Sequence, residues 1–418
     1  MGQTVAVIGA GIAGLQCALL LKESGIDVQV FERQNHIGGR MVTENVNGFL
    51  LDHGFHVMQT AYPTSQRTFD FELLGAEAFE PGALVVKKSK KKAKFWRLSD
   101  PFRRPFQGMM SGMNGFTSPF NLLRIAFLRS KVRRGSLSNV YLEGDETSER
   151  WLLNRGFSRS MIDQFFHPLF SGIFLENDLR TSERMFRFVF RMMSKGDMIL
   201  PKDGIAAAPK LLADSLGFDR IHLNSSVEKI DEFTLLVGDK NQKFDAIICA
   251  HNPHREESKR HVWTLHFDAP KSPLKSKHIL LNGDVKTKNQ LIAHVAVPSD
   301  IQPSYAPLGH SLVTVTIVGE AAQKLGLTNE HEIQLRAINE LKSWFGSQVD
   351  TWKVLAVQHI EHALPEISAN SGLSEDPNTH EESFECGDHM MHGSLEGALL
   401  SAEKTVQQVL ETLEKSQT

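Results

Sequence analysis

Short apolar runs and a helical repeat alternate at the start of the chain. Thr4 to Ile8 is a continuous apolar run, Ala13 to Ser24 has apolar residues at helical spacing, and Asp27 to Phe31 is a second apolar run. Apolar runs of this length on either side of a helix are typical of buried parallel strands. The first part of the chain therefore predicts a βαβ unit.

The rest of the pattern divides into a helical stretch and a series of strands. After Gly39 the periodicity is lost until a helix begins near Pro63, and the lysine-rich residues 87–94 are typical of a hairpin tip. Helical spacing rich in Phe, Met and Arg runs from Pro101 to about Lys195, which suits a separate lobe. Further helices are expected at Ala206 to Leu216 and Glu330 to Phe345, and strands at Arg220 to Leu223, Val227 to Ile230, Ala246 to Ala250, His261 to Phe267, Ile279 to Leu281, Gln290 to Val297 and Leu312 to Val318.

A glycine-rich turn joins the first strand to the first helix. In Gly9-Ala10-Gly11-Ile12-Ala13-Gly14 the glycines let the backbone turn tightly, approach a pyrophosphate and pack the helix on the sheet. Glu32 follows 18 residues after Gly14, at the end of the second strand, where a carboxylate accepts hydrogen bonds from both ribose hydroxyls. This context predicts a dinucleotide site that includes Gly9, Gly11, Ala13, Gly14 and Glu32.

The residues after Glu32 point to one kind of dinucleotide. Glu32-Arg33 is followed by Gly38-Gly39-Arg40. This extension resembles that of the FAD-dependent amine oxidase, phytoene desaturase and protoporphyrinogen oxidase superfamily, and the resemblance implies FAD as the cofactor. The Arg40 guanidinium can pair with pyrophosphate oxygens or a flavin carbonyl. We therefore expect Arg33, Gly39 and Arg40 to contact FAD.

The last helix begins with a second motif that looks like part of the same superfamily. Cys386-Gly387-Asp388 precedes Gly393 to Ala398 at the start of that helix. The resemblance implies that Asp388, next to Gly387, holds a ribityl hydroxyl or reaches the pyrophosphate through water. It also implies that the helix N-terminus at Ser394-Leu395 faces the flavin pyrimidine carbonyl, where its positive end stabilises reduced flavin. The two ends of the chain should meet at one site.

These motifs predict an α/β protein with two interleaved domains. A Rossmann-type FAD-binding domain is expected at 1–80, 200–255 and 380–418, and an α+β substrate domain of a mixed sheet and helices at 81–199 and 256–379. Val227 looks like the family's adenine-side strand. The resemblance implies a dehydrogenase, desaturase or oxidase that moves hydride from its substrate to flavin N5.

Residues around the flavin ring distinguish amine oxidases from the other members of this superfamily. Amine oxidases usually place a lysine on a substrate-lobe strand, whereas His261 to Phe267 has none and Lys259 lies just outside it. After Trp352 there is no Trp or Tyr, so the ring usually supplied near the C-terminal motif is missing. A desaturase-like or protoporphyrinogen-oxidase-like activity on an apolar substrate is therefore favoured over an amine oxidase, with oxygen or a quinone as the electron acceptor.

One loop looks like the loop that lies beneath the flavin ring in this superfamily. In Asp52-His53-Gly54-Phe55-His56, Gly54 and Phe55 are expected to contact the flavin. His56 is the candidate catalytic residue because it is the titratable side chain that could relay a proton there. A histidine in such a loop more often serves as a structural hydrogen-bonding group, and that alternative stays open, as it does for His392.

The amino-acid composition indicates which classes of ligand and partner to expect. The net charge of -3 gives no reason to expect nucleic acid, and 26 Phe against 3 Tyr predicts ligand-facing surfaces that are oily and poor in hydroxyls. Cys17, Cys249 and Cys386 each lie in an apolar or glycine-rich stretch, as small buried residues in a reducing compartment would. No cluster has metal-ligand spacing, so no metal is expected.

Residues 102–134 combine Phe, Leu and Met with Arg and Lys. They could rest on an anionic membrane surface, but the preferred interpretation has the apolar side chains cap the substrate cavity while the arginines face water. We find no charged leader before Thr4 and no apolar run of about 20 residues, so a cytoplasmic protein with optional peripheral membrane contact is expected. A flavin-dependent isomerase without net redox turnover and a non-catalytic flavin redox sensor remain alternatives.

Overall fold

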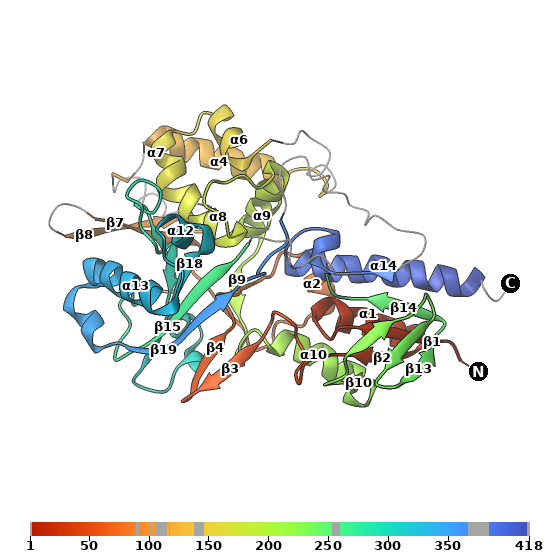
Figure 1. Ribbon diagram of the computed structural model, residues 1–418. Helices are drawn as coiled ribbons and strands as arrows, with labels where there is room; N and C mark the ends of the chain where they lie inside the picture. Colours follow the sequence, from red (N-terminus) through yellow and green to blue (C-terminus); the bar gives the residue numbers. More distant parts are fainter. Residues whose placement is uncertain are drawn as a thin grey trace.

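The computed structural model describes residues 2–88, 92–100, 102–104, 115–116, 118–137, 146–252, 260–366 and 384–415. Two lobes lie side by side, and both chain ends belong to the same lobe (Figure 1). The architecture is α/β with mixed sheets and helices, as the sequence predicts. Lys259 and the methionines at 109, 110 and 113, which the sequence analysis considered, lie outside the described residues.

The lobe that holds both termini is built on a parallel sheet of order β10-β2-β1-β14-β20. Its strands are β1 (Thr4–Ile8), β2 (Asp27–Phe31), β10 (Ile221–His222), β14 (Ala246–Cys249) and β20 (Phe384–Glu385). Val5 and Val7 face α1 (Ile12–Glu23), α10 (Ala207–Leu216) and α14 (Leu395–Lys415). Ala6 faces the antiparallel sheet of β11 (Val227–Lys229), β12 (Thr234–Val237) and β13 (Lys240–Lys243). Because both faces are covered, the central strands β1 and β14 are nearly continuous apolar runs.

The predicted domain boundaries stay a prediction. The five strands of the parallel sheet nevertheless come from the three ranges that the sequence analysis assigned to the FAD-binding domain.

A seven-stranded mixed sheet of order β19-β15-β18-β17-β16-β7-β8 forms the centre of the other lobe. Its strands are β7 (Gly82–Lys88), β8 (Ala93–Ser99), β15 (Val262–Ala269), β16 (Leu280–Asn282), β17 (His294–Ala296), β18 (Ser311–Val318) and β19 (Lys353–Ile360). Trp263, Leu265 and Phe267 alternate onto the face that packs against α13 (Glu330–Phe345). The hairpin at 83–98 is confirmed. The edge strand β19 was not predicted, because an edge strand is partly exposed and shows weaker apolar alternation.

The loss of periodicity after Gly39 does not mark the end of regular structure. β3 (Thr43–Val46) and β4 (Phe49–Asp52) form a hairpin, and its turn residues Asn47 and Gly48 have φ values of 53° and 86°. Asn-Gly between two strands is a strong hairpin signal because both turn residues need positive φ. A third small sheet joins β5 (Met58–Gln59), β9 (Met198–Leu200) and β6 (Glu77–Ala78) near the junction of the lobes.

Helices cover the second face of the large sheet. They are α4 (Pro119–Arg133), α6 (Ser148–Asn154), α7 (Arg159–Met161), the π-helical turn η1 (Ile162–Phe166), α8 (His167–Phe174) and α9 (Glu183–Lys195). Phe166, Phe170 and Phe186 form the centre of their apolar core. The short helices α2 (Pro63–Thr68), α11 (Pro298–Ile301) and α12 (Gly319–Lys324) complete the described elements used below. Within the described ranges, no helix is long and apolar enough to cross a membrane.

The predicted roles of the side chains in residues 102–134 need correction. The apolar residues Leu128 and Val132 are buried in the helical core, but Phe120 and Phe127 on the same helix are exposed. Arg104, Arg124, Arg133 and Arg134 are exposed, as expected. Arg103 and Arg129 were also expected to face water, but they are half-buried and donate to the backbone carbonyl groups of Gly196 and Ser194. Guanidinium groups suit this position because those carbonyls end a helix and lack intrahelical partners.

Candidate functional site

The glycines of the first turn lie where β1 passes into α1. Gly9 has a φ of 107°, in the region that favours glycine. A β-carbon at Gly14 would lie 2.0 Å from the carbonyl oxygen of Gly9, so only glycine lets α1 pack this closely on the strand. Ala13 is buried in the first turn of α1. The turn has the form that a dinucleotide requires, and binding by these residues remains a prediction.

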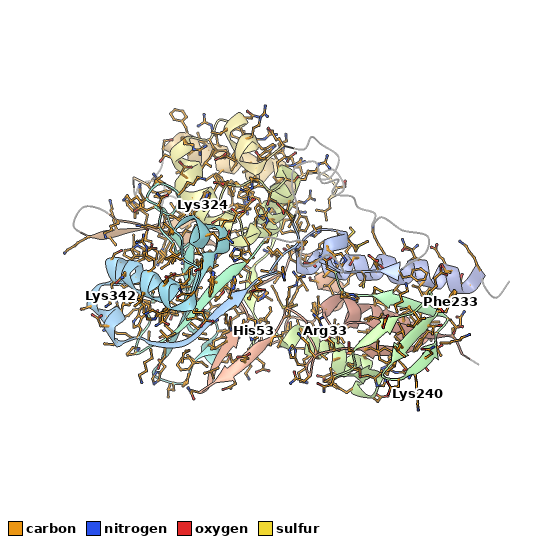
Figure 2. The ribbon with its side chains drawn as sticks, viewed as in Figure 1. Arg33, His53, Phe233, Lys240, Lys324 and Lys342 are labelled. Carbon is orange, nitrogen blue, oxygen red and sulfur yellow. The ribbon has the colours of Figure 1, made fainter. Side chains whose placement is uncertain are left out.

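A second glycine pair lies against this turn. Gly38 forms a parallel bridge with Gly11, and a β-carbon at Gly39 would lie 3.3 Å from the Cα atom of Gly11. The two backbone segments therefore approach each other without side chains between them. Arg33 is exposed near the junction of the lobes, where Figure 2 labels it.

Glu32 is buried at the end of β2 and is held by the glycine turn. One carboxylate oxygen accepts the Ala10 N–H at 2.8 Å, and the other accepts the Gln34 N–H at 2.9 Å. The Ser225 N–H, two residues before Val227, donates to the Glu32 carbonyl at 2.7 Å. Glu32 and the segment before β11 therefore lie together beside the glycine turn. This is the arrangement that the sequence predicts for a ribose and adenine site.

Arg40 joins the two ends of the chain. Its guanidinium forms an ion pair with Asp388 at 2.6 Å and donates to the Ala363 carbonyl at 2.7 Å. Next to Asp388, Gly387 has a φ of 145° and donates its N–H to Ser401 on α14. The structure therefore brings the N-terminal and C-terminal motifs together, as expected, but it pairs Arg40 with Asp388 directly.

The N-terminus of α14 is open toward the same region. Ser394 caps the helix by accepting the Gly397 N–H on its side-chain oxygen at 3.1 Å. Among the described residues, the N–H groups of Leu395 and Glu396 have no hydrogen-bond partner. Two free N–H groups at the start of a long helix favour a carbonyl or an anionic oxygen as their partner.

Asp52 anchors the loop that carries Gly54, Phe55 and His56. The buried carboxylate accepts hydrogen bonds from Thr43 Oγ at 2.6 Å, from the Ile205 N–H at 3.0 Å and from Tyr305 OH at 3.0 Å. Burial raises the pKa of Asp52 to about 6, and the three hydrogen bonds oppose that rise. The loop that follows is therefore fixed to three separate segments of the chain.

His56 lies in this loop as a neutral side chain. Burial lowers the pKa of His56 to about 4, and the charge on Arg40 acts in the same direction. Its Nε2 lies 2.8 Å from the His53 carbonyl, so this nitrogen carries the proton and donates. This geometry favours the structural alternative over a proton relay.

Polar side chains cross the sheet face beside the loop. Register places a row of buried or half-buried polar side chains across β19, β15, β18 and β17: Gln358, Thr264, Thr316 and His294. The Gly54 N–H donates to Gln358 Oε1 at 3.1 Å, and the Phe55 ring lies 5.6 Å from the ring of His294. The loop therefore crosses both ends of this row.

Sequence reasoning missed Tyr62, Gln358 and Glu396 as members of the site. Tyr62 precedes α2, and its hydroxyl interacts with the Ser394 side chain at the start of α14. Only the scarcity of tyrosine in the chain could have drawn attention to it. Gln358 belongs to the edge strand that the pattern did not reveal, and Glu396 acts on a segment 332 residues away.

The residues present fit a dinucleotide that carries a ring system. A strip free of side chains runs along Gly11 and Gly39, the buried carboxylate of Glu32 lies at one end, and the open N-terminus of α14 lies in the same region as Arg40 and Asp388. No group of three or more potential metal ligands occurs in the part of the chain that the structure describes. The Sγ atoms of Cys17 and Cys386 lie 3.4 Å apart as buried free thiols.

The chain is similar to known flavoproteins. The family described as flavin containing amine oxidoreductase matches residues 12–279. Protoporphyrinogen oxidase 2 of Arabidopsis thaliana is 24% identical over 320 residues, which cover 68% of this chain and 60% of that protein. Zeta-carotene desaturase of Solanum lycopersicum is 28% identical over 184 residues, 40% of this chain and 30% of that protein. The chain thus spans less than two thirds of the length of either relative.

Solved structures agree on the fold. An oxidoreductase from Methanosarcina mazei superimposes with a TM-score of 0.73 at 19% identity and covers 98% of this chain and 100% of its own. Identity at this level supports the shared architecture and leaves the reaction open.

Proposed function

Because the chain belongs to the flavin containing amine oxidoreductase family, we propose that it is an FAD-dependent oxidoreductase that takes hydride from an apolar small molecule onto flavin N5. The observation that carries the proposal is the meeting of both chain ends, in which Arg40 pairs with Asp388 at 2.6 Å beside the open N-terminus of α14. One elongated ligand would explain why motifs so far apart in sequence converge.

Each part of the site has a role in holding the cofactor. Gly11 and Gly39 would give the pyrophosphate close access to backbone, Gly9 and Gly14 allow the turn and the packing of α1 on β1 beside it, and Glu32 would bind the ribose. The N–H groups of Leu395 and Glu396 hold the pyrimidine carbonyl. A bound flavin supplies the hydride acceptor.

The protein orients the substrate and excludes water. Phe55 is half-buried against Phe79 and His294, so it gives the substrate an apolar and rigid surface. His56 holds its proton on the nitrogen that faces the His53 carbonyl, so we assign it a positioning role within the loop. Oxygen or a quinone is the proposed electron acceptor. We propose a cytoplasmic location because the three cysteines are free thiols.

The first test is the visible absorption spectrum of the purified protein, followed by anaerobic addition of a carotenoid, a porphyrinogen or an amine. We expect FAD bands that one apolar class bleaches. Bleaching by an amine alone would favour an amine oxidase. If no substrate class bleaches the FAD bands but the protein converts a substrate without an added electron acceptor, the isomerase is favoured. A protein that binds no flavin after reconstitution with FAD would contradict the proposal.

We further propose that α4 contacts an anionic membrane surface. Its side chains Phe120, Leu123 and Phe127 are 71%, 57% and 75% exposed and follow one another along one side of the helix. Four exposed cations share this helix and the residue after it, namely Arg124, Lys131, Arg133 and Arg134. An apolar stripe flanked by cations suits an anionic bilayer surface.

Vesicle sedimentation tests this contact. We expect the protein to pellet with vesicles of phosphatidylcholine and phosphatidylglycerol but much less with phosphatidylcholine alone. Serine at Phe120, Leu123 and Phe127 should abolish pelleting. Serine at Phe218 and Phe233, which are exposed on the dinucleotide lobe, is the matched control and should leave pelleting unchanged. Equal loss in both variants would contradict a role for α4.

A further inference from the structure

Tyr62 is held in place by the N-terminus of α14. The buried carboxylate of Glu396, in the first turn of α14, accepts the Thr64 N–H at 3.0 Å and the Ser65 N–H at 3.3 Å. These are N–H groups at the start of α2, and Tyr62 is the residue that precedes this helix. The carboxylate thus caps α2 and fixes Tyr62 relative to α14.

The ring of Tyr62 is fixed from a second direction. It stacks on Phe188 of α9, with ring centroids 5.7 Å apart and an interplanar angle of 10°. Phe188 is buried and also contacts the ring of His392 at 4.6 Å. Tyr62 itself is only half-buried. A rigid aromatic side chain held by α9 and α14 therefore keeps part of its surface accessible.

The hydroxyl of Tyr62 has unused hydrogen-bonding capacity. Its protein partner among the described residues is Ser394, whose Oγ also accepts the Gly397 N–H and lies 2.9 Å from His392 Nδ1. A phenol can both donate and accept, and Ser394 can fill only one of these roles. Burial and the charge of Glu396 raise the pKa of Tyr62, so the hydroxyl stays protonated at neutral pH.

Apolar side chains pack against the same helical core as Tyr62. Half-buried members of this group include Phe55, Ala61, Ile173, Phe190 and Met193. A hydrocarbon would leave this hydroxyl without a second partner, whereas a polar group would pair with it.

We propose that Tyr62 determines substrate specificity by hydrogen-bonding an uncharged N–H, hydroxyl or carbonyl group of a substrate that is otherwise apolar. The inference rests on the proposed function, and it narrows the substrate class, since a pure hydrocarbon polyene lacks such a group. The substrate would lie against Phe55 and Tyr62 and present its polar group to the Tyr62 hydroxyl.

Isothermal titration calorimetry with three probes of similar shape tests this. Indane is a hydrocarbon, indoline carries an N–H group and 1-indanone carries a carbonyl. We expect the purified holoprotein to bind at least one polar probe about tenfold more tightly than indane, the size of one hydrogen bond. In Tyr62→Phe this preference should disappear while the affinity for indane is unchanged.

Ser343→Ala is the control, because it removes a hydroxyl on α13 that donates to the Glu340 carbonyl, away from the predicted site. It should retain the preference. The inference is overturned if the wild type does not distinguish the probes or binds none, or if Tyr62→Phe keeps the preference. Flavin absorbance of the same samples reports separately on the proposed function: a preference without bound flavin would overturn that function and leave the role of Tyr62 standing.

Discussion

Asp52 joins three segments of the chain through one buried carboxylate. Thr43, Ile205 and Tyr305 come from a hairpin, the loop before α10 and the segment before β18, and all three donate to it. The donors compensate only part of the cost of burying a charge, so the pKa of Asp52 rises from 3.8 to about 6. A change of pH should therefore affect the stability of this junction.

Between about pH 4 and pH 6, folded Asp52 holds a proton that the unfolded chain has already released. This group contributes stability that is present below pH 4 and is lost as pH rises through 6. Asp52→Asn should therefore gain stability relative to wild type across this window, by on the order of 2–3 kcal/mol. Urea unfolding at several pH values measures the difference. Asp203→Asn, at an exposed position, is the control, and a flat difference for Asp52→Asn would contradict the prediction.

At the scale of elements, two helices end at the same place. The C-terminal ends of α4 and α9 lie together, because Arg191 of α9 donates to the carbonyls of residues 134, 135 and 136 just after α4. In return, Arg129 and Arg133 of α4 donate to the Ser194 carbonyl of α9. Two negative helix ends in contact repel each other, and the arginines offset this repulsion while they satisfy the free carbonyls.

Arg191→Met should therefore weaken the helical lobe. The substitution keeps most of the apolar stem but leaves three carbonyl groups without their donor, so we expect the free energy of unfolding to fall by about 2 kcal/mol. Urea unfolding followed by circular dichroism measures this. Lys131→Met, on the exposed side of α4, should change stability little. If both variants are equally stable, the arginine does not act as a cap.

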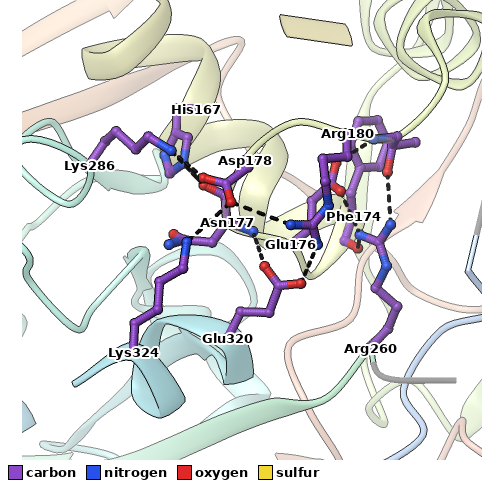
Figure 3. A network of polar contacts seen from close by, with 11 residues as sticks. His167, Phe174, Glu176, Asn177, Asp178, Arg180, Arg260, Lys286, Glu320 and Lys324 are labelled. Atoms are coloured by element: carbon purple, nitrogen blue, oxygen red, sulfur yellow. Dashed lines mark hydrogen bonds and ion pairs between the residues drawn. The ribbon is translucent and has the colours of Figure 1, made fainter. Parts of the chain in front are cut away.

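At the scale of the whole molecule, the segment after α8 connects the helical lobe to the large sheet (Figure 3). Arg260, just before β15, pairs with the buried Glu176 at 3.0 Å and donates to the Phe174 carbonyl at 2.7 Å. Next to this pair, charged side chains form a second group: Asp178, Arg180, Lys286, Glu320 and Lys324. The buried pair is the part of this network from which solvent is excluded, so its removal should have the largest effect.

Arg260→Met leaves Glu176 as a buried charge without its guanidinium, and we expect a loss of about 3–5 kcal/mol in the free energy of unfolding. The double variant Arg260→Met with Glu176→Gln should lose less than Arg260→Met alone, because no unpaired charge remains. Arg180→Met, in the exposed pair with Glu320, should lose at most about 1 kcal/mol. Additive effects in the double variant would show that the pair is not coupled.

Most of the regular structure could be read from local pattern. The buried strands β1 and β2 and the helix α13 lie where the apolar spacing predicts them. Their buried faces require apolar residues at a regular spacing, and this spacing can be read from residues that are close together in the sequence. The Asn47-Gly48 hairpin was also readable, but its signal lies in turn chemistry and not in periodicity. β19 is different, since an edge strand has a weaker pattern until a neighbour defines its buried side.

The sequence by itself determined the glycine turn, the placement of Glu32 at the end of β2 and the glycine motif before the last helix, because each depends on residues that are close along the chain. Only the tertiary structure decided that Arg40 pairs with Asp388, that Glu396 caps α2 and that Tyr62 meets Ser394. Partners more than 300 residues apart leave no trace in spacing, because the chain between them can fold back in many ways. Packing of the two lobes selects one of these arrangements, and with it the side chains that face the ligand.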